Sequence, residues 1–490
     1  MKPLHDEWVL RAAPVGAGFV PPLPEPLRSI LLRRALPPEA CEGAGGPRVL
    51  TEADFRVFNA PSVVDLHDGS LIAGMTDACA RILDAVRRRE RILIYGDYDV
   101  DGVTSIVLLQ TVLKTIGADV GFVVPHRQVD GYGLKMEVLE RVLAESDVRL
   151  VITVDCGISS VEPVRLALER GIDVIVTDHH LPPGFLPDAV AVLNPKKAGC
   201  EYPFDELAGV GVAFKLAVAL LERSARSMSI ASLLKIAAIG TVADVAPLIG
   251  ENRTITKLGL DGLSDPRNPG LRALLRQLGL IGRPVKSSDV GFKIGPRINA
   301  AGRLASADTA IQLFAARSES DAFPIVMELE RLNGERRRIE KLVLTEAEAQ
   351  IDPANVPNIL IVAGHRWHKG VLGLCAARLM QKYHRPALVM AEHEGVFVGS
   401  GRSIPGINLH GQLDRIRDEF TSFGGHEAAC GFSFPAARLD SLRARSIRRS
   451  SKHIRVSSLS VLGIPNRCFC SKGPNASERK SSRRIASRSG

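Results

Sequence analysis

Between residues 91 and 195, short apolar runs alternate with segments of helical pattern, and this alternation limits the fold more than any other feature. The runs read RILIYG, ADVGFVVP, VRLVITVDCG, IDVIVTDHH and AVAVLNP. Apolar residues that continue through a strand, without alternating with polar ones, are typical of strands buried on both faces. Strands of this kind with helices between them predict a parallel sheet in an α/β layer fold.

Acidic and imidazole side chains come at the carboxyl ends of these apolar runs. They are Asp97, Asp99 and Asp101 after ILIY, Asp155 after LVITV, Asp178, His179 and His180 after DVIVT, and Asp244 after IAAIGTVA. The carboxyl ends of strands in an open parallel sheet face one crevice, where ligands bind. We therefore expect the three strand-borne groups to converge, with Asp244 joining them from a helix end.

Two simpler interpretations of these acids were weighed. The stretch GDYDVDG begins like an EF-hand loop, but its twelfth position, counted from Asp97, is Leu108 where a bidentate Glu is needed, and the preceding residues are β-like. A single Asp after a strand is often a helix N-cap, and Asp155 alone could be one. Taken together, the four groups favour a catalytic metal site, because independent structural reasons would have to coincide.

Mixed Asp and His ligands suit a pair of divalent cations, with Mn²⁺ preferred because of the histidine and Mg²⁺ as the alternative. Two such ions about 3.5 to 4 Å apart can activate water and clamp the attacking and leaving oxygens of a phosphoryl group. The sequence thus predicts a metal-dependent phosphoesterase.

Composition places the chain among ordinary globular proteins, with 45% hydrophobic and 24% charged residues. Its formal net charge of +9 comes from the C-terminal end, where residues 441–490 carry 13 Lys and Arg against the single acid Glu478. The body of the chain is nearly neutral, so any nucleic-acid site must be a local basic groove. We see no membrane span and no secretory signal, and the scattered cysteines fit a reduced compartment. We expect a cytoplasmic monomer.

The domain organisation is predicted as follows. Residues 1–50 form an irregular N-terminal segment, and residues 51–315 form the catalytic α/β domain with a helical extension. Residues 316–352 form a long, charged connecting helix. A smaller α/β domain covers residues 353–436, and residues 437–490 form a disordered tail rich in Ser and Arg.

Several motifs carry a family resemblance. TDHH (177–180) resembles the signature of the DHH phosphoesterase superfamily. YGDYDVDGVTS, VDCGIS, TDHH, GTVADVAPL and GPRINAAGRL, in this order, are similar to the motif series of its RecJ family of single-stranded-DNA-specific exonucleases. FGGHEAACGFS (423–433) resembles the glycine-rich motif of the associated DHHA1 domain. The match runs from about residue 50 to residue 435.

The resemblance implies a role for each site residue. Metal ligation falls to Asp99, Asp101, Asp155, His179 and Asp244, whereas His180 would face the scissile phosphate. Asp97 would orient the ligands or touch one metal. Tyr95 stands where relatives often have His.

Residue chemistry suggests where the substrate phosphates bind. Arg303 and Arg402 lie among small residues, and Arg suits bidentate phosphate binding. Ser400 adds a hydroxyl, and His426 follows two glycines whose backbone N–H groups can bind an anion. Arg127 is a further candidate, although a surface salt bridge is the alternative for each Arg. Two less certain suggestions are that Trp367 stacks on a base and that His365 and His368 touch nucleic acid, against core or surface roles for the histidines.

The function implied is 5′-to-3′ hydrolysis of single-stranded DNA to 5′-mononucleotides in DNA repair and recombination. Single-stranded-DNA-binding protein and a RecQ-type helicase are the protein partners that the resemblance adds. The alternatives are a DHH-type oligoribonuclease, phosphatase or pyrophosphatase on small substrates, or a weakened DNA-binding protein. RecJ-type chains usually continue into an OB-like domain, and the Ser/Arg-rich tail here is either an out-of-frame product or a basic arm, so we expect impaired DNA affinity.

Overall fold

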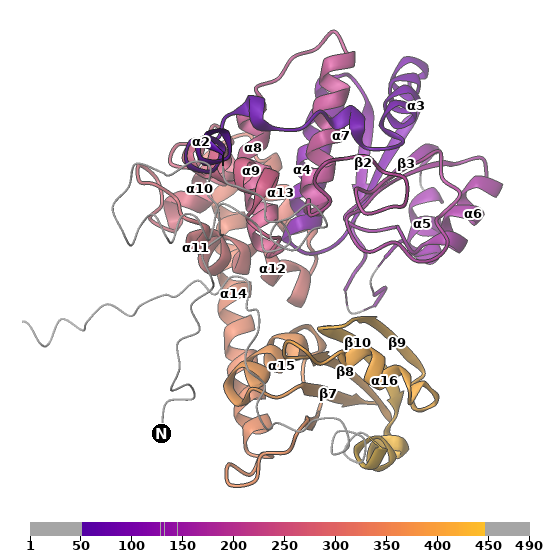
Figure 1. Cartoon of the computed structure of the whole chain (residues 1–490), viewed down its shortest axis with the longest axis vertical. Helices are drawn as coiled ribbons and strands as arrows, with labels where there is room; N and C mark the ends of the chain where they lie inside the picture. Colours follow the sequence, from indigo (N-terminus) through magenta and orange to yellow (C-terminus); the bar gives the residue numbers. More distant parts are fainter. Residues whose placement is uncertain (1–50, 128, 132, 145, 446–490) are drawn as a thin grey trace, which may run out of the picture. The chain divides into compact units, whose positions relative to one another are not determined.

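The computed structural model describes residues 51–127, 129–131, 133–144 and 146–445 (Figure 1). The predicted N-terminal segment 1–50 and most of the predicted tail lie outside this range. The described chain divides into two compact units, the first ending at Lys341 and the second beginning at Leu342. No helix in the described part is both long and apolar enough to cross a membrane.

The first unit is built on the predicted parallel sheet. Its strands are β1 (Arg91–Gly96), β2 (Asp119–Val123), β3 (Val148–Val154), β4 (Asp173–Thr177) and β5 (Ala191–Leu193). They run parallel in the order β2-β1-β3-β4-β5. Because the chain order reverses at β1, the carboxyl ends of β1 and β3 form the switch point where open α/β sheets bind their ligands.

Helices cover both faces of this sheet (Figure 1). Residues of β1 alternate between two apolar cores, with Ile92 and Ile94 in one and Leu93 and Tyr95 in the other. Helices α3 (Met75–Arg88), α4 (Val100–Thr115) and α7 (Gly209–Arg223) contribute to the first core. Helices α5 (Met136–Leu143) and α6 (Val161–Glu169) contribute to the second. Burial on both faces explains why the strands read as continuous apolar runs.

A helical extension completes the first unit and shares its larger core. Helix α8 (Ile230–Ala243) packs against α4, α7 and α9 (Gly250–Gly262). The remaining helices are α2 (Glu52–Asn59), α10 (Pro269–Gln277), α11 (Ser287–Asp289), α12 (Gly295–Leu304) and α13 (Asp308–Ala315), with the short 3-10 helices η2 (Val63–Asp65) and η3 (Gly69–Leu71) and the π-helix η4 (Val290–Ile294). The long helix α14 (Glu319–Glu348) matches the predicted charged helix.

The second unit holds a mixed sheet with the order β6-β7-β8-β10-β9. Strands β6 (Leu360–His365) and β7 (Ala387–His393) pair in parallel, while β8 (Val396–Arg402), β10 (Ala429–Pro435) and β9 (Ser422–His426) continue antiparallel. Helices α15 (Lys369–Tyr383) and α16 (Leu409–Asp414) and the 3-10 helices η5 (Arg417–Glu419) and η6 (Ala436–Arg438) complete it. The two strands predicted within RPALVMAEHEGVFVGSGRS are β7 and β8.

Ordered packing in this unit continues past the boundary predicted at residue 436. Leu442 is fully buried in the apolar core of the second unit. Arg445 donates to the carboxylates of Asp418 and Glu419, and Ser441 donates to Glu419. Residues 437–445 therefore belong to the folded unit and not to the predicted disordered tail, because an apolar side chain and an ion pair anchor them.

Candidate metal centre and phosphate-binding residues

The loop that follows β1 supplies three of the acids. Asp99 is the N-cap of α4, and one of its carboxylate oxygens accepts hydrogen bonds from the backbone N–H groups of Asp101 (2.8 Å) and Gly102 (3.1 Å). A Cβ on Gly102 would collide with the carbonyl oxygen of Asp97. Glycine at this position thus permits the tight turn that brings the acids of GDYDVDG to one edge of the sheet.

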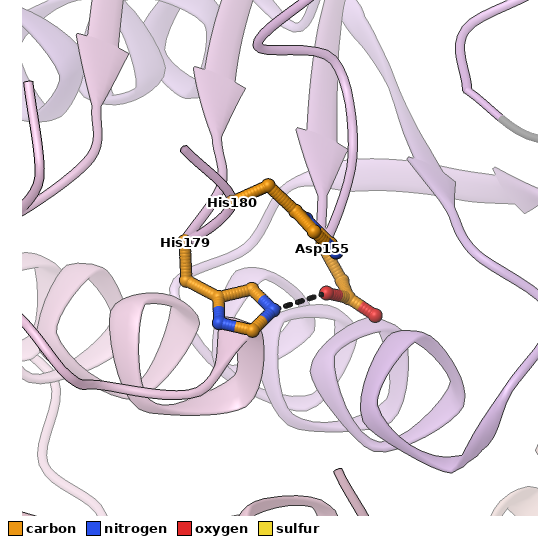
Figure 2. Close-up of side chains that lie close together, drawn as sticks. All are labelled: Asp155, His179 and His180. Atoms are coloured by element: carbon orange, nitrogen blue, oxygen red, sulfur yellow. Dashed lines mark ion pairs between the residues drawn. The ribbon is translucent and has the colours of Figure 1, made fainter. Parts of the chain in front are cut away.

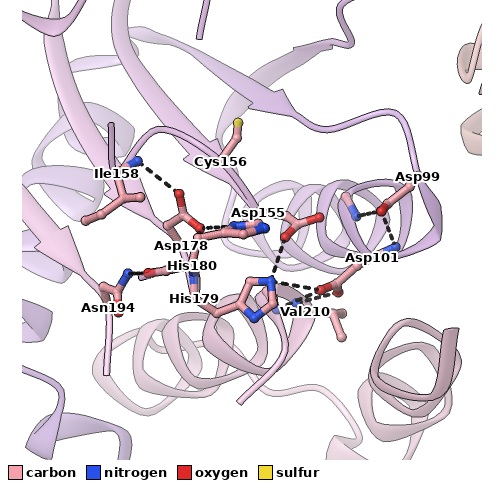
Figure 3. Close-up of polar contacts among 12 residues, drawn as sticks. Asp99, Asp101, Asp155, Cys156, Ile158, Asp178, His179, His180, Asn194 and Val210 are labelled. Atoms are coloured by element: carbon pink, nitrogen blue, oxygen red, sulfur yellow. Dashed lines mark hydrogen bonds and ion pairs between the residues drawn. The ribbon is translucent and has the colours of Figure 1, made fainter. Parts of the chain in front are cut away.

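Asp101 is held by the start of a second helix. Its carboxylate oxygens accept from the backbone N–H groups of Gly209 (2.7 Å) and Val210 (2.7 Å), at the first turn of α7. These N–H groups have no partner within the helix, and the positive end of the helix dipole favours an anion there. The contact joins residues more than 100 positions apart and fixes the carboxylate of Asp101 (Figure 3).

Asp155 lies at the end of β3, next to β1, and its backbone has a φ of 59°, in the left-handed region. It does not cap a helix, since α6 begins later with Ser160 as its N-cap. Nε2 of His179 lies 3.2 Å from Oδ1 of Asp155 (Figure 2) and 3.9 Å from Oδ2 of Asp101 (Figure 3). A Cβ on Gly209 would lie 2.7 Å from Oδ1 of Asp155, so this glycine makes room for the carboxylate.

Asp178 organises the histidine pair after β4. Its carboxylate accepts from the backbone N–H groups of Ile158 (2.9 Å), His179 (2.7 Å) and His180 (3.0 Å). Nδ1 of His180 lies 2.7 Å from Oδ1 of Asp178 (Figure 3). An ionised carboxylate only accepts hydrogen bonds, so Nδ1 carries the proton and Nε2 remains for other groups.

Potential ligand atoms from these elements form three overlapping groups, each with all atoms within 4.8 Å of one another. They comprise Asp155, His179 and His180; Asp101, His179 and Asp244; and Asp97, Asp99 and Asp155. Asp244 is the C-cap of α8, so the fourth acid does arrive from a helix end. Asp155 and His179 each belong to two of the groups, so the three groups overlap in space.

Burial and mutual repulsion perturb the acids strongly. Burial, followed by the charge of a neighbouring carboxylate, raises the pKa of Asp97, Asp101 and Asp155 well above the usual range. The same causes, burial first and then Asp99, raise the pKa of Asp244 to about 7. Burial and then the neighbouring His180 lower the pKa of His179 to about 3. Without a cation the carboxylates therefore tend to hold protons, while His179 is a neutral imidazole suited to ligation.

Two buried atoms support the presence of a cation at this cluster. Oδ1 of Asp97 and Nε2 of His179 are shielded from solvent and make no hydrogen bond within the described residues. Buried polar atoms without a hydrogen bond are costly, and a divalent ion bound beside each would satisfy it. The Asp-rich set with one imidazole fits Mn²⁺ and Mg²⁺. Asp97 lies in a group of potential ligands, which agrees with the second of its two expected roles, contact with one metal.

Two of the predicted phosphate-binding arginines lie near the acidic cluster, around the ring of Tyr98. The guanidinium of Arg127 is 4.7 Å from the centre of that ring. Burial is the main cause of the raised pKa of Tyr98, and the charges of Arg127 and Arg303 oppose it. A Cβ on Gly302 would collide with the carbonyl oxygen of Tyr98, so the glycine before Arg303 allows α12 to approach the GDYDVDG loop.

The other three phosphate candidates lie on one face of the second sheet. Arg402 of β8 pairs with Ala429 of β10, which pairs with His426 of β9. Directly paired residues share a face, so Arg402 and His426 stand on the same side about 10 Å apart. Ser400 is two residues before Arg402, and its hydroxyl accepts from Nη1 of Arg402 at 3.0 Å.

Open space lies beside Ser400 on this face. Ser400 pairs with Gly431, and Gly431 pairs with Gly424. Nothing lies within 4 Å of where a Cβ would stand on either glycine. At Gly431 and Gly424 this face of the sheet is therefore bare backbone. The hydroxyl of Ser400, the guanidinium of Arg402 and the imidazole of His426 stand on the same face.

Trp367 does not stack on a ligand, contrary to the suggestion from the sequence. Its side chain is buried, and its indole N–H donates to Glu346 of α14. The ring lies where a Cβ on Gly364 would stand, so it packs against β6. His365 pairs with Glu392 on the neighbouring strand, and His368 is the N-cap of α15. These three residues stabilise the second unit through contacts within it.

Tyr95 is not part of the ligand set. Its side chain is buried in the second core of the first unit, where its hydroxyl donates to the carbonyl of Gly133 (3.1 Å) and accepts from the N–H of Lys135 (3.2 Å). It anchors the far end of the loop that carries Arg127.

The chain matches family models over both units. The model of the DHH family N-terminal domain matches residues 91–241, and that of the DHHA1 domain matches residues 356–451. The single-stranded-DNA-specific exonuclease RecJ of Salmonella typhimurium is 38% identical over 396 residues, which are 76% of this chain and 68% of that protein. The chain belongs to the RecJ family. The RecJ protein of Bacillus subtilis is 40% identical over 81% of this chain and 50% of its own length.

A solved RecJ structure shares the fold. The crystal structure of RecJ from Thermus thermophilus in complex with Mn²⁺ superposes with a TM-score of 0.70 and 34% sequence identity, covering 78% of this chain and 55% of that one. The chain thus spans about half the length of the Bacillus and Thermus relatives. The DHH and DHHA1 assignments made from the motifs are confirmed.

Some functional partners carried little sequence signal. Asp178 was noted only as part of a polar cluster, because nothing in TDHH tells which of three adjacent polar residues orients another. The N–H groups of Gly209 and Val210 belong to an apolar stretch whose only hint is its glycines. Asn194, which follows β5, donates to the carbonyl of His180 at 2.9 Å, and no sequence motif marks it.

Proposed function

We propose that this chain is a metal-dependent exonuclease that hydrolyses single-stranded DNA from the 5′ end and releases 5′-mononucleotides. The proposal is carried by the convergence of seven acidic and imidazole side chains at the carboxyl edge of the first sheet. They are Asp97, Asp99, Asp101, Asp155, His179, His180 and Asp244. Membership of the RecJ family supports the substrate class and the direction. The mixed Asp and His set supports two cations, Mn²⁺ in preference to Mg²⁺.

The three ligand groups divide naturally between two cations. Asp97 and Asp99 would hold one cation, and Asp101, His179 and Asp244 would hold the other, with the two carboxylate oxygens of Asp155 able to contact either. When bound, such a pair lowers the pKa of water and neutralises charge on the phosphoryl oxygens. The protein keeps the ligands in place through the N–H groups of α7 and α4, so little reorganisation is required on binding.

His180 would bind the scissile phosphate. Its pKa is raised because, although burial acts in the opposite direction, Asp178 accepts its Nδ1 hydrogen bond and supplies a negative charge. A protonated imidazole with Nδ1 engaged presents Nε2–H as a donor to a phosphate oxygen. It can stabilise charge on the phosphorus as it becomes five-coordinate, or donate a proton toward the leaving oxygen.

The predicted phosphate-binding side chains would position the DNA strand. Arg127 and Arg303 offer guanidinium groups beside the acidic loop, and Ser400, Arg402 and His426 offer a second set of donors in the DHHA1 unit. Arg is suited to bidentate phosphate binding. Glycines without side chains would let the sugar-phosphate backbone of DNA approach the sheet closely. Backbone contacts of this type carry no base sequence information, so we expect cleavage with little sequence preference.

Digestion of 5′-labelled single-stranded DNA with Mn²⁺ tests the proposal. The wild-type chain should release labelled mononucleotide from the single strand and leave a blunt duplex of the same sequence intact. Asp155→Asn should lose at least about 10³-fold in kcat while still binding the strand. Asp147→Asn is the matched control, since this Asp is 82% exposed and pairs only with Arg149.

Other outcomes would replace the proposal. Hydrolysis of dinucleotides or pyrophosphate without action on long strands would assign the chain to the small-substrate phosphoesterases. Binding of single strands without any turnover in Mn²⁺ or Mg²⁺ would leave a DNA-binding protein with an inactive centre.

A further inference from the structure

Val245 has a backbone conformation that valine rarely adopts. Helix α8 ends with Asp244 as C-cap, and Val245, the next residue, has a φ of 64°. This is the position after a helix where glycine, and less often asparagine, takes up the left-handed conformation. A β-branched residue there is a true outlier, because its Cβ substituents crowd the backbone.

The fold does not use the side chain that causes this strain. Val245 is 84% exposed. Its backbone N–H bonds to the carbonyl of Val242 at 3.3 Å, a contact that any residue except proline could make. Packing therefore does not favour valine at this position, and the backbone disfavours it. Strained residues persist where function requires them. The exposed isopropyl group of Val245 is therefore a candidate for contact with a ligand.

Val245 stands beside the metal centre. It is joined by one peptide bond to Asp244, whose carboxylate groups with Asp101 and His179 within 4.8 Å. A second exposed apolar side chain occupies the equivalent place on another element, since Leu181 directly follows His180 and is 77% exposed. Two residues of the candidate site, Asp244 and His180, are thus each followed by an apolar side chain that is exposed to solvent.

We propose that Val245 and Leu181 form an apolar rim that contacts the sugar and base of the nucleotide being released. The inference rests on the proposed function, because it takes an unpaired nucleotide as the ligand. Apolar side chains bind exposed base faces, and they wedge between bases only at the cost of unstacking them. In a duplex the faces are stacked and the edges paired, so this contact favours an unpaired end.

Val245→Asn separates the contact from the backbone strain. Asparagine adopts the left-handed conformation more readily, so Tm should stay the same or rise by about 1–2 °C. The rise in Tm produced by Mn²⁺ should match that of wild type, because Asp244 keeps its place. The KM for single-stranded DNA should increase about 3- to 10-fold with kcat changed less than about 2-fold, as expected for lost apolar contact.

Further variants give the comparison its controls. Leu181→Ser should raise KM by a similar factor, and Val245→Leu should bind more tightly than Val245→Asn because it restores an apolar side chain. Val64→Asn is the matched control, since Val64 is 87% exposed in η2 and adjoins none of the site residues in sequence. It should leave both KM and kcat unchanged.

The outcomes distinguish this inference from the proposed function. If wild type does not degrade single strands, the proposed function fails. If wild type degrades them and both Val245→Asn and Leu181→Ser have wild-type KM, the apolar rim is wrong and the function stands. A loss of the Mn²⁺-induced rise in Tm in Val245→Asn would also overturn the inference, because valine would then serve the metal ligand and not the nucleotide.

Discussion

His179 and His180 are neighbours in the chain, yet their surroundings give them opposite protonation tendencies. Burial keeps His179 neutral, with a pKa lowered to about 3, whereas the hydrogen bond to Asp178 raises the pKa of His180. A neutral imidazole is a metal ligand, and a protonated one is a phosphate donor. The motif resemblance predicts different roles for these two adjacent histidines, and their different surroundings agree with that prediction. The physical cause, burial for His179 and Asp178 for His180, depends on the fold and is not visible in the sequence.

Asp178→Asn should test this division of roles. Asn still accepts hydrogen bonds but supplies no negative charge, so His180 is less often protonated. We expect kcat to fall about 10- to 100-fold with little change in the affinity for single strands. The Mn²⁺-induced rise in Tm should be retained, since Asp178 is in none of the three ligand groups. Equal loss of metal binding and turnover would instead give Asp178 a role in ligation.

The raised carboxylate pKa values predict how the metal-free protein responds to pH. A carboxyl group with a folded pKa above its unfolded value binds a proton in the folded state that the unfolded chain has already lost. Between those two values the free energy of unfolding decreases as the pH rises. For Asp244 the window extends from about 4 to about 7.

Thermal unfolding in EDTA checks this prediction. Tm should fall as the pH is raised from about 4.5 to 7, and Asp244→Asn, which mimics the protonated acid, should reduce the slope. Mn²⁺ should raise Tm more at pH 8 than at pH 5.5, because protons compete with the ion for the same ligands. If the Tm of the metal-free protein rose between about pH 4.5 and 7, the raised carboxylate pKa values would be wrong.

The ends of three helices supply or hold the acids of the candidate metal site. The N-terminus of α4 is capped by Asp99, that of α7 binds Asp101, and the C-terminus of α8 presents Asp244. The strands and most helices were predictable because apolar periodicity is local. The contacts between helix ends were not, since Gly209 and Asp101 are far apart in sequence and nothing local encodes their pairing.

Asn252, in the first turn of α9, joins two of these ends. Its side-chain amide donates to the carbonyl of Pro247, three residues after Asp244, and to that of Glu206, three residues before Gly209. The residue is fully buried. It thus ties the segment carrying one ligand to the segment that binds another, and we regard it as a positioning residue.

Asn252→Ala should therefore weaken metal binding as well as stability. Two carbonyls lose their donor, which costs about 1–3 kcal/mol of the free energy of unfolding. The apparent Kd for Mn²⁺ should rise about 10-fold. Asn268→Ala is the control, because Asn268 caps α10 and donates to the carbonyl of Phe314. It should cost similar stability without changing the Kd, and equal effects of both variants on metal affinity would contradict the positioning role.

The chain divides into two units with different candidate site residues, with acids and imidazoles clustered in the first and proposed phosphate-binding side chains in both. The long charged helix and the two strand patterns are strong sequence signals, and both are present as α14 and the two sheets. The boundary at residue 436 was misplaced since composition changes gradually, and Leu442 and Arg445 are anchored by partners that the local sequence does not reveal.

Truncation at two points separates the contribution of the second unit from that of residues 446–490. A chain ending at Arg445 keeps Leu442 in its core and should have the Tm of the full chain. A chain ending at Arg438 loses this fully buried leucine, at a cost of about 1.5–3 kcal/mol to the second unit. Residues 446–490 are strongly basic, so their removal should lower the affinity for single strands mainly at low salt and flatten the dependence of binding on salt concentration. Titrations of both truncated chains and the full chain at several salt concentrations measure these effects. An unchanged salt dependence after removal of residues 446–490 would show that Arg127, Arg303 and Arg402 supply the phosphate contacts without help from the tail.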